Sequence, residues 1–412
     1  MREVIVVGGG ASGLVAAISA ARNGAHVTLL EQKERIGKKI LSTGNGRCNL
    51  TNTYMDSKCF YGDDTSIVST VLEQFGTEET TRFFEDLGVV LKERQGYIYP
   101  YSDQATTIVD ALSIELNALN VSVITDTCVI DIQKLDSGFS VTTLNRQYLS
   151  DAIILATGGK AAPVLGSDGK GFELAQKLGH HISNVVPALV QLRGVGTYFR
   201  QIAGVRTQAK VSLFVEQQLV ASDTGELQLT NYGISGIPVF QISRFAAKAC
   251  ANKKIVSAEI DFMPHMEEPD FDEFMKKRIV AHGEKTAEDF LIGLFNTKIG
   301  MLLLKEAKIP TKIRIKDIYD EKLNHFIFLC KHFQIEIAGT NDFEQAQVCA
   351  GGIKTSEIHP NTMESIYVKN LYITGEVLDI DGICGGYNLQ WAWATGFLAG
   401  KNAAKGYMND KN

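Results

Sequence analysis

The stretch Val4-Ile5-Val6-Val7-Gly8-Gly9-Gly10-Ala11-Ser12-Gly13-Leu14-Val15-Ala16-Ala17-Ile18 decides the fold of this chain. Its β-branched residues are typical of a buried parallel strand, and the glycines at the spacing G-x-G-x-x-G open a helix of small residues. Gly8 permits a tight turn, Gly10 lets backbone N–H groups approach a pyrophosphate, and Gly13 lets the helix pack on the strand. The pattern predicts a dinucleotide clamp, with the anion at the positive end of the helix.

A second strand, His26–Leu30, ends in the acid Glu31. An acid about 20 residues beyond the glycines accepts both hydroxyls of an adenosine ribose, which favours FAD or NAD over a cofactor with a 2′-phosphate. The alternative is an ordinary βαβ unit, but the order of strand, helix, strand and acid favours a nucleotide site. No second G-x-G-x-x-G occurs, so the sequence does not predict a separate nicotinamide domain.

The composition limits the partners of the chain. Its 412 residues suffice for about two or three domains. The formal net charge of −6 argues against a surface that coats nucleic acid. The uncharged run 4–21 is interrupted by glycine and serine, so it suits a strand, turn and helix better than a membrane span or export signal. We expect neither nucleic acid nor membrane as a partner and a cytoplasmic location, and the oligomeric state is left open.

Cysteine and histidine spacing gives no metal signature. The 7 cysteines are scattered without a C-x-x-C pair, and the 8 histidines include no H-E-x-x-H spacing. We therefore predict no disulfide framework and no metal. The adjacent His180-His181 is interpreted as a surface turn, and a redox dithiol of Cys48 and Cys384 is disfavoured by their separation.

A polar stretch follows the predicted nucleotide unit. It begins with basic residues 33–39 and continues as Leu41-Ser42-Thr43-Gly44-Asn45-Gly46-Arg47-Cys48-Asn49-Leu50-Thr51-Asn52. Its glycines would let the backbone approach a flat ring, although a long polar turn is the alternative. Arg47 is a candidate for tuning the ring. Acid–base candidates, each of which packing would also explain, are Tyr97, Tyr99, Tyr232 and Tyr387.

Periodicity predicts the elements of the first half. Helical spacing within 66–118 predicts two helices around an aromatic, turn-rich loop at 96–101. Alternation over 121–151 predicts a β-meander, and the apolar run 152–159 predicts a buried strand that returns the chain to the cofactor.

The segments after residue 188 have a different periodicity. Alternation after residue 188 predicts an antiparallel sheet or small barrel, interrupted by a helical stretch over about 271–333. Strand character resumes at 370–376, and the glycine pair Gly385-Gly386 opens a helix whose positive end suits an anion or dipole.

The predicted fold class is α/β, a two-dinucleotide-type Rossmann domain with an inserted β-barrel and helical region. Residues 1–189 and 350–412 are expected to form the discontinuous FAD-binding domain, and 190–349 the inserted domain. Within the insert, the β part is about 190–262 and 335–349, and the helical part is about 263–334.

Several segments together resemble the bacterial BaiN/RdsA-type NAD(P)/FAD-dependent oxidoreductases, also called aminoacetone oxidase family flavoproteins. They are Gly8–Gly13, Thr43–Asn52, Thr230–Gly236, Thr362–Ser365 and Gly375–Trp393. The resemblance covers essentially the whole chain, and it implies non-covalent FAD and a small organic substrate. Around the middle motif the chain departs from the family at Asn231, Tyr232 and Ile237.

The resemblance also implies the reaction and the site. NAD(P)H would dock transiently over the flavin as electron donor; the alternatives are an amine oxidase that uses O₂ and a non-catalytic flavin-bearing redox or binding protein. Expected catalytic residues are Arg47, Cys48 and Asn49. Expected to line the cofactor are Gly8, Gly10, Ala11, Ser12, Gly13, Glu31, Gln32, Lys38, Lys39, Thr43, Gly44, Asn45, Gly46, Arg47, Val129, Ala156, Thr157, Gly158, Gly375, Glu376, Asp381, Gly386, Asn388 and Leu389.

Overall fold

The computed structural model describes residues 1–405, and the chain separates into two compact units. Unit 1 comprises Met1–Val185 and Gln347–Asn412, of which the last seven residues are not described. Unit 2 comprises Val186–Ala346 and so interrupts unit 1 in the sequence. None of the described helices is both long and apolar enough to cross a membrane.

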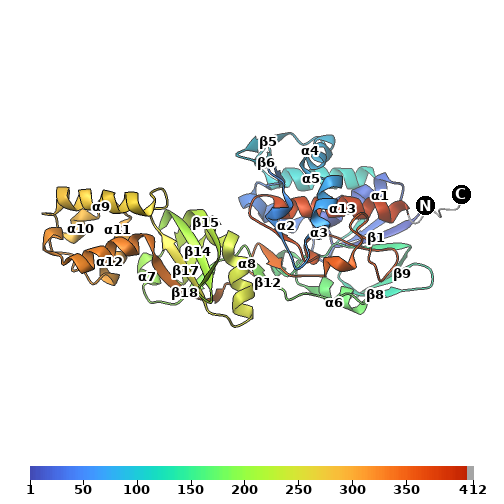
Figure 1. The fold of residues 1–412 in the computed structure, drawn as a ribbon. Helices are drawn as coiled ribbons and strands as arrows, with labels where there is room; N and C mark the ends of the chain where they lie inside the picture. The colour runs from blue at the N-terminus through green and yellow to red at the C-terminus, as the bar shows by residue number, and fades with distance from the viewer. Residues whose placement is uncertain (406–412) are drawn as a thin grey trace. The chain divides into compact units, whose positions relative to one another are not determined.

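A five-stranded parallel sheet forms the centre of unit 1 (Figure 1), in the order β20-β11-β1-β2-β7. Its strands are β1 (Glu3–Val7), β2 (His26–Leu30), β7 (Ser122–Ile124), β11 (Ala152–Leu155) and β20 (Leu371–Ile373). The apolar run Val4–Val7 is buried, as a parallel strand covered on both faces requires. Parallel pairing puts the carboxyl ends of all five strands at one edge of the sheet.

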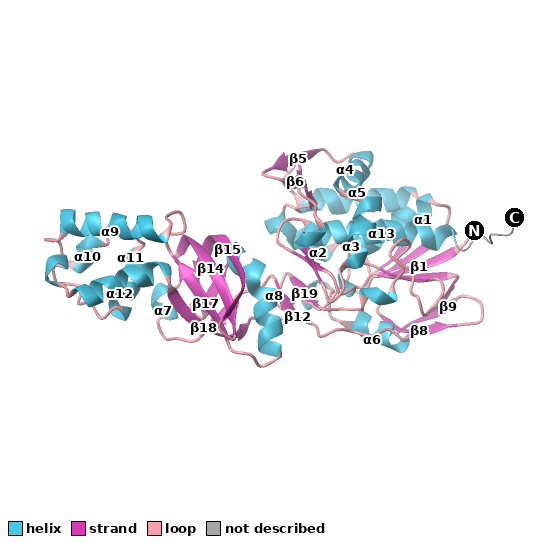
Figure 2. Cartoon of the chain, in the orientation of Figure 1, coloured by secondary structure: helices cyan, strands magenta, loops and turns pink. Residues whose placement is uncertain are grey.

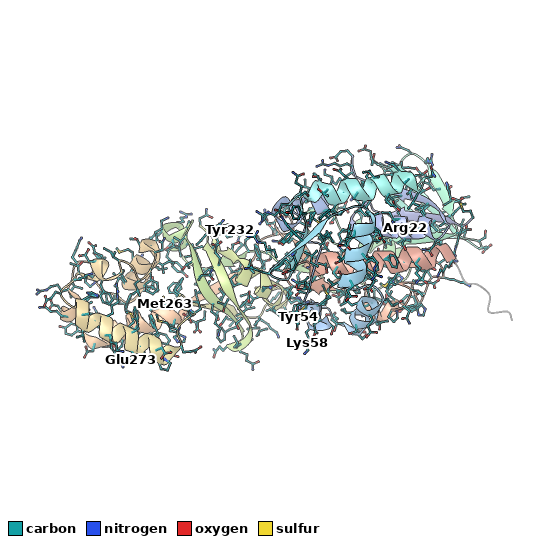
Figure 3. The ribbon with its side chains drawn as sticks, turned by 90° about the horizontal axis from the view of Figure 1, so that it is seen from above. Arg22, Tyr54, Lys58, Tyr232, Met263 and Glu273 are labelled. Carbon is teal, nitrogen blue, oxygen red and sulfur yellow. The ribbon has the colours of Figure 1, made fainter. Side chains whose placement is uncertain are left out.

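Helices α1 (Ala11–Arg22) and α13 (Tyr387–Lys405) pack backbone to backbone in unit 1. A Cβ on Gly396 would stand 2.3 Å from the Ser12 oxygen, and one on Gly400 would stand 2.2 Å from the Ala16 oxygen. Arg22, labelled in Figure 3, ends α1 and pairs with Glu115 at 2.8 Å. The first and last long helices thus share one layer.

The region after β2 contains more elements than predicted. It comprises α2 (Lys38–Ser42), η1 (Thr43–Gly46), β3 (Thr51–Asn52), η2 (Ser57–Cys59), β4 (Phe60–Tyr61), α3 (Ser66–Gln74), α4 (Thr77–Asp86), β5 (Leu91–Arg94), β6 (Tyr97–Pro100) and α5 (Ala105–Ala118). The prediction of two helices was wrong because Gly76 starts a new helix, its N–H donating to Glu79 Oε2 at 2.9 Å. The expected aromatic loop at 96–101 is largely strand β6, paired with β3 and β5.

The predicted meander is confirmed for three strands of unit 1, β8 (Val129–Lys134), β9 (Phe139–Thr143) and β10 (Gln147–Ser150). Its first expected strand was wrong, because β7 pairs parallel with β2 in the central sheet. Alternation over three residues cannot distinguish the two sheets. The remaining elements are η3 (Pro163–Leu165), α6 (Lys170–Lys177), β19 (Val348–Ala350), η5 (Thr355–Glu357), η6 (Gly375–Val377) and β21 (Asp381–Gly382).

The interpretation of His180-His181 as a surface turn was wrong for His180, whose side chain is fully buried. Its Nδ1 lies 2.9 Å from Glu357 Oε2, and its Nε2 lies 2.8 Å from Ser365 Oγ. Because Ser365 Oγ already accepts two backbone N–H groups, we assign its hydroxyl as the donor to Nε2. A neutral imidazole thus joins the segment after α6 to the segment before β20.

Unit 2 is a closed antiparallel barrel in the order β13-β16-β15-β14-β17-β18, with helices attached (Figure 2). The strands are β13 (Leu192–Gly194), β14 (Arg206–Val215), β15 (Gln218–Leu229), β16 (Gly233–Gly236), β17 (Val256–Asp261) and β18 (Phe333–Thr340), preceded by β12 (Val186–Ala188). The helices are α7 (Phe199–Ile202), α8 (Ile237–Ala251), α9 (Glu268–His282), α10 (Ala287–Phe290), α11 (Thr297–Glu306), η4 (Ile315–Asp317) and α12 (Asp320–Lys331). The predicted fold class and the helical stretch 271–333 are confirmed.

One buried lysine fixes the helical part of unit 2 to its barrel. The ammonium of Lys331 donates to Asp261 Oδ2 at 2.8 Å, to the Met263 oxygen at 3.0 Å and to the Met266 oxygen at 2.7 Å. Lys331 is the last residue of α12, just before the chain returns to the barrel at β18. Its partners lie at the end of β17 and in the segment that connects β17 to α9. The lysine therefore joins the segment that leaves the barrel to the segment that returns to it.

Candidate cofactor and active site

The glycines after β1 are required for different reasons. A Cβ on Gly8 would stand 2.4 Å from the Ala156 oxygen, and one on Gly13 would stand 1.9 Å from the Gly8 oxygen. Close packing of the protein therefore demands these two glycines. A Cβ on Gly10 would meet nothing within 4 Å, so this residue faces open space at the first turn of α1. Backbone N–H groups of that turn face the same space.

Glu31 lies beside this turn at the end of β2. Its Oε2 accepts the Gly9 N–H at 2.7 Å, and its Oε1 accepts the Lys33 N–H at 2.8 Å. Burial raises its pKa, partly offset by these hydrogen bonds and by Lys33. A carboxylate has about four lone-pair sites, so Glu31 keeps acceptor capacity for a ligand.

Other residues expected near the adenosine lie at the same edge of the sheet. The Ala156 N–H donates to the Val7 oxygen at 2.9 Å, which puts the start of Ala156–Gly158 beside Gly8. The Thr127 N–H donates to the Glu31 oxygen at 2.8 Å, which brings Val129 toward the end of β2. The Gln32 amide is engaged elsewhere, donating to the Gly166 oxygen at 2.6 Å.

The segment at Gly375 reaches the first turn of α1. A Cβ on Gly375 would stand 2.6 Å from Ser12 Oγ, and the Gly375 N–H donates to Thr395 Oγ1 at 3.0 Å. The Trp391 indole N–H donates to the Gly375 oxygen at 3.2 Å. Two residues of α13, Thr395 and Trp391, therefore hold Gly375 against the turn that is predicted to bind the pyrophosphate.

Glu376 and Lys39 form an ion pair at 2.7 Å. The other oxygen of Glu376 accepts the Cys349 N–H at 2.9 Å, and Lys39 also donates to the Ala161 oxygen at 3.2 Å. The neighbouring Lys38 pairs with Glu34 at 3.0 Å, so the two adjacent lysines have different partners.

The predicted ring-binding loop has an unusual backbone. Four of its residues have left-handed φ angles: Gly44 (55°), Asn45 (55°), Gly46 (81°) and Cys48 (59°). Left-handed non-glycine residues cost energy and concentrate at functional sites. Thr43 begins this loop and donates from Oγ1 to the Ile40 oxygen at 2.6 Å.

The three expected catalytic residues of this loop differ in exposure. Arg47 is exposed, whereas Cys48 and Asn49 are buried. Burial raises the pKa of the Cys48 thiol to about 12, so a thiolate nucleophile is disfavoured there. Asn49 Oδ1 is buried without a hydrogen-bond partner among the described residues, and such an atom calls for a ligand or water.

Helix α13 also holds the end of this loop. The Trp393 indole N–H donates to the Leu50 oxygen at 3.0 Å, and a Cβ on Gly386 would stand 2.8 Å from the Thr51 backbone. The Asn388 amide exchanges two hydrogen bonds of 2.8 Å with Gly382, so this side chain is engaged within the protein. The first turn of α13, which includes Leu389, begins with backbone N–H groups that have no acceptor within the helix and so face a ligand.

The expected cofactor residues thus fall into two groups in unit 1. One surrounds the first turn of α1 and the end of β2, and the other joins the loop 43–49 to the first turn of α13. Asp381 is buried in β21, between the two segments that contribute Gly375 and Asn388. Tyr232 belongs to unit 2, where its hydroxyl receives a hydrogen bond from the Asn341 amide at 3.0 Å. No cluster of three potential metal ligands occurs among residues 1–405.

Sequence reasoning missed Thr395, Gly396 and Gly400, which position Gly375 and Ser12. The G-x-x-x-G spacing of the two glycines was the available signal, because it lets helix backbones approach closely.

Residues 2–402 match the family model described as the HI0933-like protein Rossmann domain. The chain belongs to this family. It is 48% identical over 411 residues to the 3-dehydro-bile acid delta(4,6)-reductase of Clostridium scindens, covering 98% of this chain and 100% of that protein. It is 26% identical to the ribosomal RNA dihydrouridine synthase of Escherichia coli, covering 97% of each. The chain is therefore an oxidoreductase of this family.

Among solved structures, the fold resembles 3-ketosteroid delta1-dehydrogenase from Sterolibacterium denitrificans, with a TM-score of 0.51 and 12% identity. The alignment covers 98% of this chain and 100% of that one. At this identity the likeness shows a shared fold.

Proposed function

We propose that the protein is an FAD-dependent reductase of carbon–carbon double bonds conjugated to a carbonyl group. The names of the relatives support this reaction class. A 3-dehydro-bile acid with delta-4 unsaturation is a conjugated enone, and dihydrouridine is uridine saturated at a double bond conjugated to a carbonyl. Both names therefore describe reduction of the same kind of bond.

The residues of unit 1 fit FAD in an extended pose. Gly10, whose Cβ would meet nothing within 4 Å, leaves room for a pyrophosphate at the positive end of α1. Glu31 offers a buried carboxylate to the adenosine ribose. At the other group, Asn49 Oδ1 is a buried acceptor without a partner among the described residues, suited to an N–H of a flavin ring. The open space at Gly10 is the observation that most supports FAD as the cofactor.

FAD, when bound, supplies the hydride and electron chemistry. The protein provides charge and placement. The first turn of α13 directs N–H groups that stabilise negative charge, and the left-handed backbone of 44–46 admits a flat ring. The ion pair of Lys39 and Glu376 joins the segment before the loop 43–49 to the segment before α13.

The nearer relative favours a small organic substrate over RNA. The identity is 48% to the bile acid reductase and 26% to the rRNA enzyme. The formal net charge of −6 is also unfavourable for phosphate backbones. We propose NAD(P)H as a transient electron donor, and with it a cytoplasmic location, where that donor is regenerated.

Anaerobic mixing of the FAD-loaded protein tests this proposal. NADH, NADPH and a panel of amines are each added while the flavin band near ~450 nm is followed. We expect a nicotinamide to bleach the band and a conjugated enone to restore it. Bleaching by an amine and recovery with O₂ would support an amine oxidase, and no bleaching by any donor would indicate a flavin-bearing binding protein. Retention on a tRNA column at moderate salt would favour an RNA substrate.

A further inference from the structure

One face of the β5–β6 hairpin in unit 1 combines basic and aromatic side chains. Lys92 pairs with Tyr99 across the hairpin, and Arg94 pairs with Tyr97. Residues directly opposite in an antiparallel pair point to the same face. These four side chains therefore share one surface, which we call the hairpin face.

The two tyrosine rings of this face lie against glycines of the proposed flavin site. The Tyr99 ring is 3.5 Å from the position of a Cβ on Gly44, and the Tyr97 ring is 3.3 Å from that on Gly385. The ring centroids are 6.5 Å apart. The hairpin face thus spans the ring-binding loop and the segment before α13.

Two arginines leave a net positive charge at this place. Lys92 is compensated, because it pairs with Asp103 at 2.5 Å. Arg94 and Arg47 are exposed, and neither forms an ion pair or side-chain hydrogen bond with the residues described. Burial raises the pKa of Tyr99, and the positive charges of Arg47 and Arg94 offset this only in part. The hairpin register puts Arg94 opposite Tyr97, and Arg47 follows Gly44, against which the Tyr99 ring lies. Both arginines therefore lie at the same pair of tyrosine rings.

We propose that Arg47 and Arg94, beside the rings of Tyr97 and Tyr99, bind a carboxylate of the substrate. This inference rests on the proposed function and adds the substrate class, a conjugated carbonyl compound that also carries a carboxylate. Guanidinium groups match carboxylates in charge and planar geometry, and the tyrosine rings supply apolar contact beside them. The 2′-phosphate of NADPH is the other source of an anion.

A matched substrate pair tests the inference. A 3-oxo-4-ene steroid carboxylic acid and its methyl ester differ only in the charge of interest. We expect Arg94→Ala to raise KM for the acid about tenfold or more and to leave KM for the ester within about twofold, since losing a charge-assisted hydrogen bond to a bound ligand typically costs about a tenfold step in affinity. Arg94→Lys should restore part of the affinity. Arg82→Ala, which removes an exposed arginine of α4, is the control.

Binding without turnover separates this inference from the proposed function. The acid and ester are titrated into the FAD-loaded protein without reductant, and the shift of the flavin spectrum gives Kd. If wild type reduces neither compound, the reductase proposal fails, while a preference for the acid that Arg94→Ala abolishes still supports the anion site. If Arg94→Ala changed the Kd of the acid and of the ester equally, or changed neither, the proposed anion site would be wrong. A rise in KM for NADPH alone, with NADH and the acid unchanged, would also overturn it.

Discussion

Ser12 and Gly396 touch backbone to backbone, since a Cβ on the glycine would stand 2.3 Å from the serine oxygen. Ser12 also lies against Gly375, which Thr395 holds by a hydrogen bond of 3.0 Å. One crossing of two helices therefore places both the predicted pyrophosphate turn and the glycine before Glu376.

Gly396→Ala is expected to destabilise the protein and weaken its retention of FAD. The added methyl group would separate α1 from α13, and overpacking of this kind costs about 1–3 kcal/mol. Urea unfolding of the apoprotein measures the stability, and flavin absorbance after gel filtration measures retention. Lys401→Ala, an exposed change on the same helix, should leave both unchanged. A variant as stable as wild type would contradict the close crossing.

Gly10→Ala should separate folding from cofactor binding. Its Cβ would meet no protein atom within 4 Å, and the φ of −84° suits alanine, so the apoprotein should unfold at the wild-type urea concentration. Its Kd for FAD should rise at least about tenfold, since the methyl group would occupy pyrophosphate space. Gly8→Ala should fail to fold properly, because φ is +107° and the Ala156 oxygen would lie 2.4 Å away. Wild-type FAD affinity of Gly10→Ala would remove the main support for the clamp.

Cys48 should resist alkylation in the native protein. With a pKa of about 12, about one thiol in ten thousand is ionised at pH 8. Iodoacetamide followed by mass spectrometry should label the partly exposed Cys128, Cys250 and Cys384 first, and Cys48 only after denaturation. Rapid native labelling of Cys48 would instead support its expected catalytic role.

Acid should destabilise the protein through His180. Burial lowers its pKa, and the hydrogen bond to Glu357 offsets this only in part, so the unfolded state binds more protons once pH falls below about 6.5. Burial raises the pKa of Glu357, but hydrogen bonds from His181 and His180 outweigh it and lower that pKa, which adds a second loss below about 4.5. The free energy of unfolding should therefore fall as pH drops from 7 to 5.

Substitution of His180 tests its contribution to the loss of stability in acid. His180→Gln should be less stable than wild type at pH 7 but should lose less free energy of unfolding between pH 7 and pH 5, measured by urea titration. His325→Gln, which removes an exposed histidine of α12, is the matched control. An unchanged slope in His180→Gln would show that other groups carry the acid sensitivity.

Local sequence patterns predicted the parts of the fold in which one periodicity dominates. The run Val4–Val7 followed by glycines could only suit a buried strand and a tight turn, and the structure has both. The capping of α10 by Thr286, whose Oγ1 accepts the Asp289 N–H, was also predictable from local chemistry. Short strands were harder, because the three residues of β7 fit either the meander or the central sheet.

In the candidate site, too, some residues were predictable from local sequence and others were not. The glycine spacing and Glu31 could be predicted as a pair from the sequence, because a phosphate and a ribose impose fixed geometry on a site for them, and the structure brings the Gly9 N–H to Glu31. The partners of Glu376, Lys39 and the Cys349 N–H, could not, since they come from distant segments. Lys331 is another example, because nothing near it in sequence shows that its ammonium is enclosed by three acceptors.

The crossing of α1 with α13 also sets an order of events during synthesis. The ribosome makes α1 long before α13, and all of unit 2 is made between them. Until α13 emerges, the small buried residues Ala16 and Ala20 of α1 lack their final cover and present an apolar surface. Such surfaces promote association of incomplete chains. A nascent chain stalled before residue 387 should therefore depend on chaperones, whereas a chain that includes α13 can cover this surface.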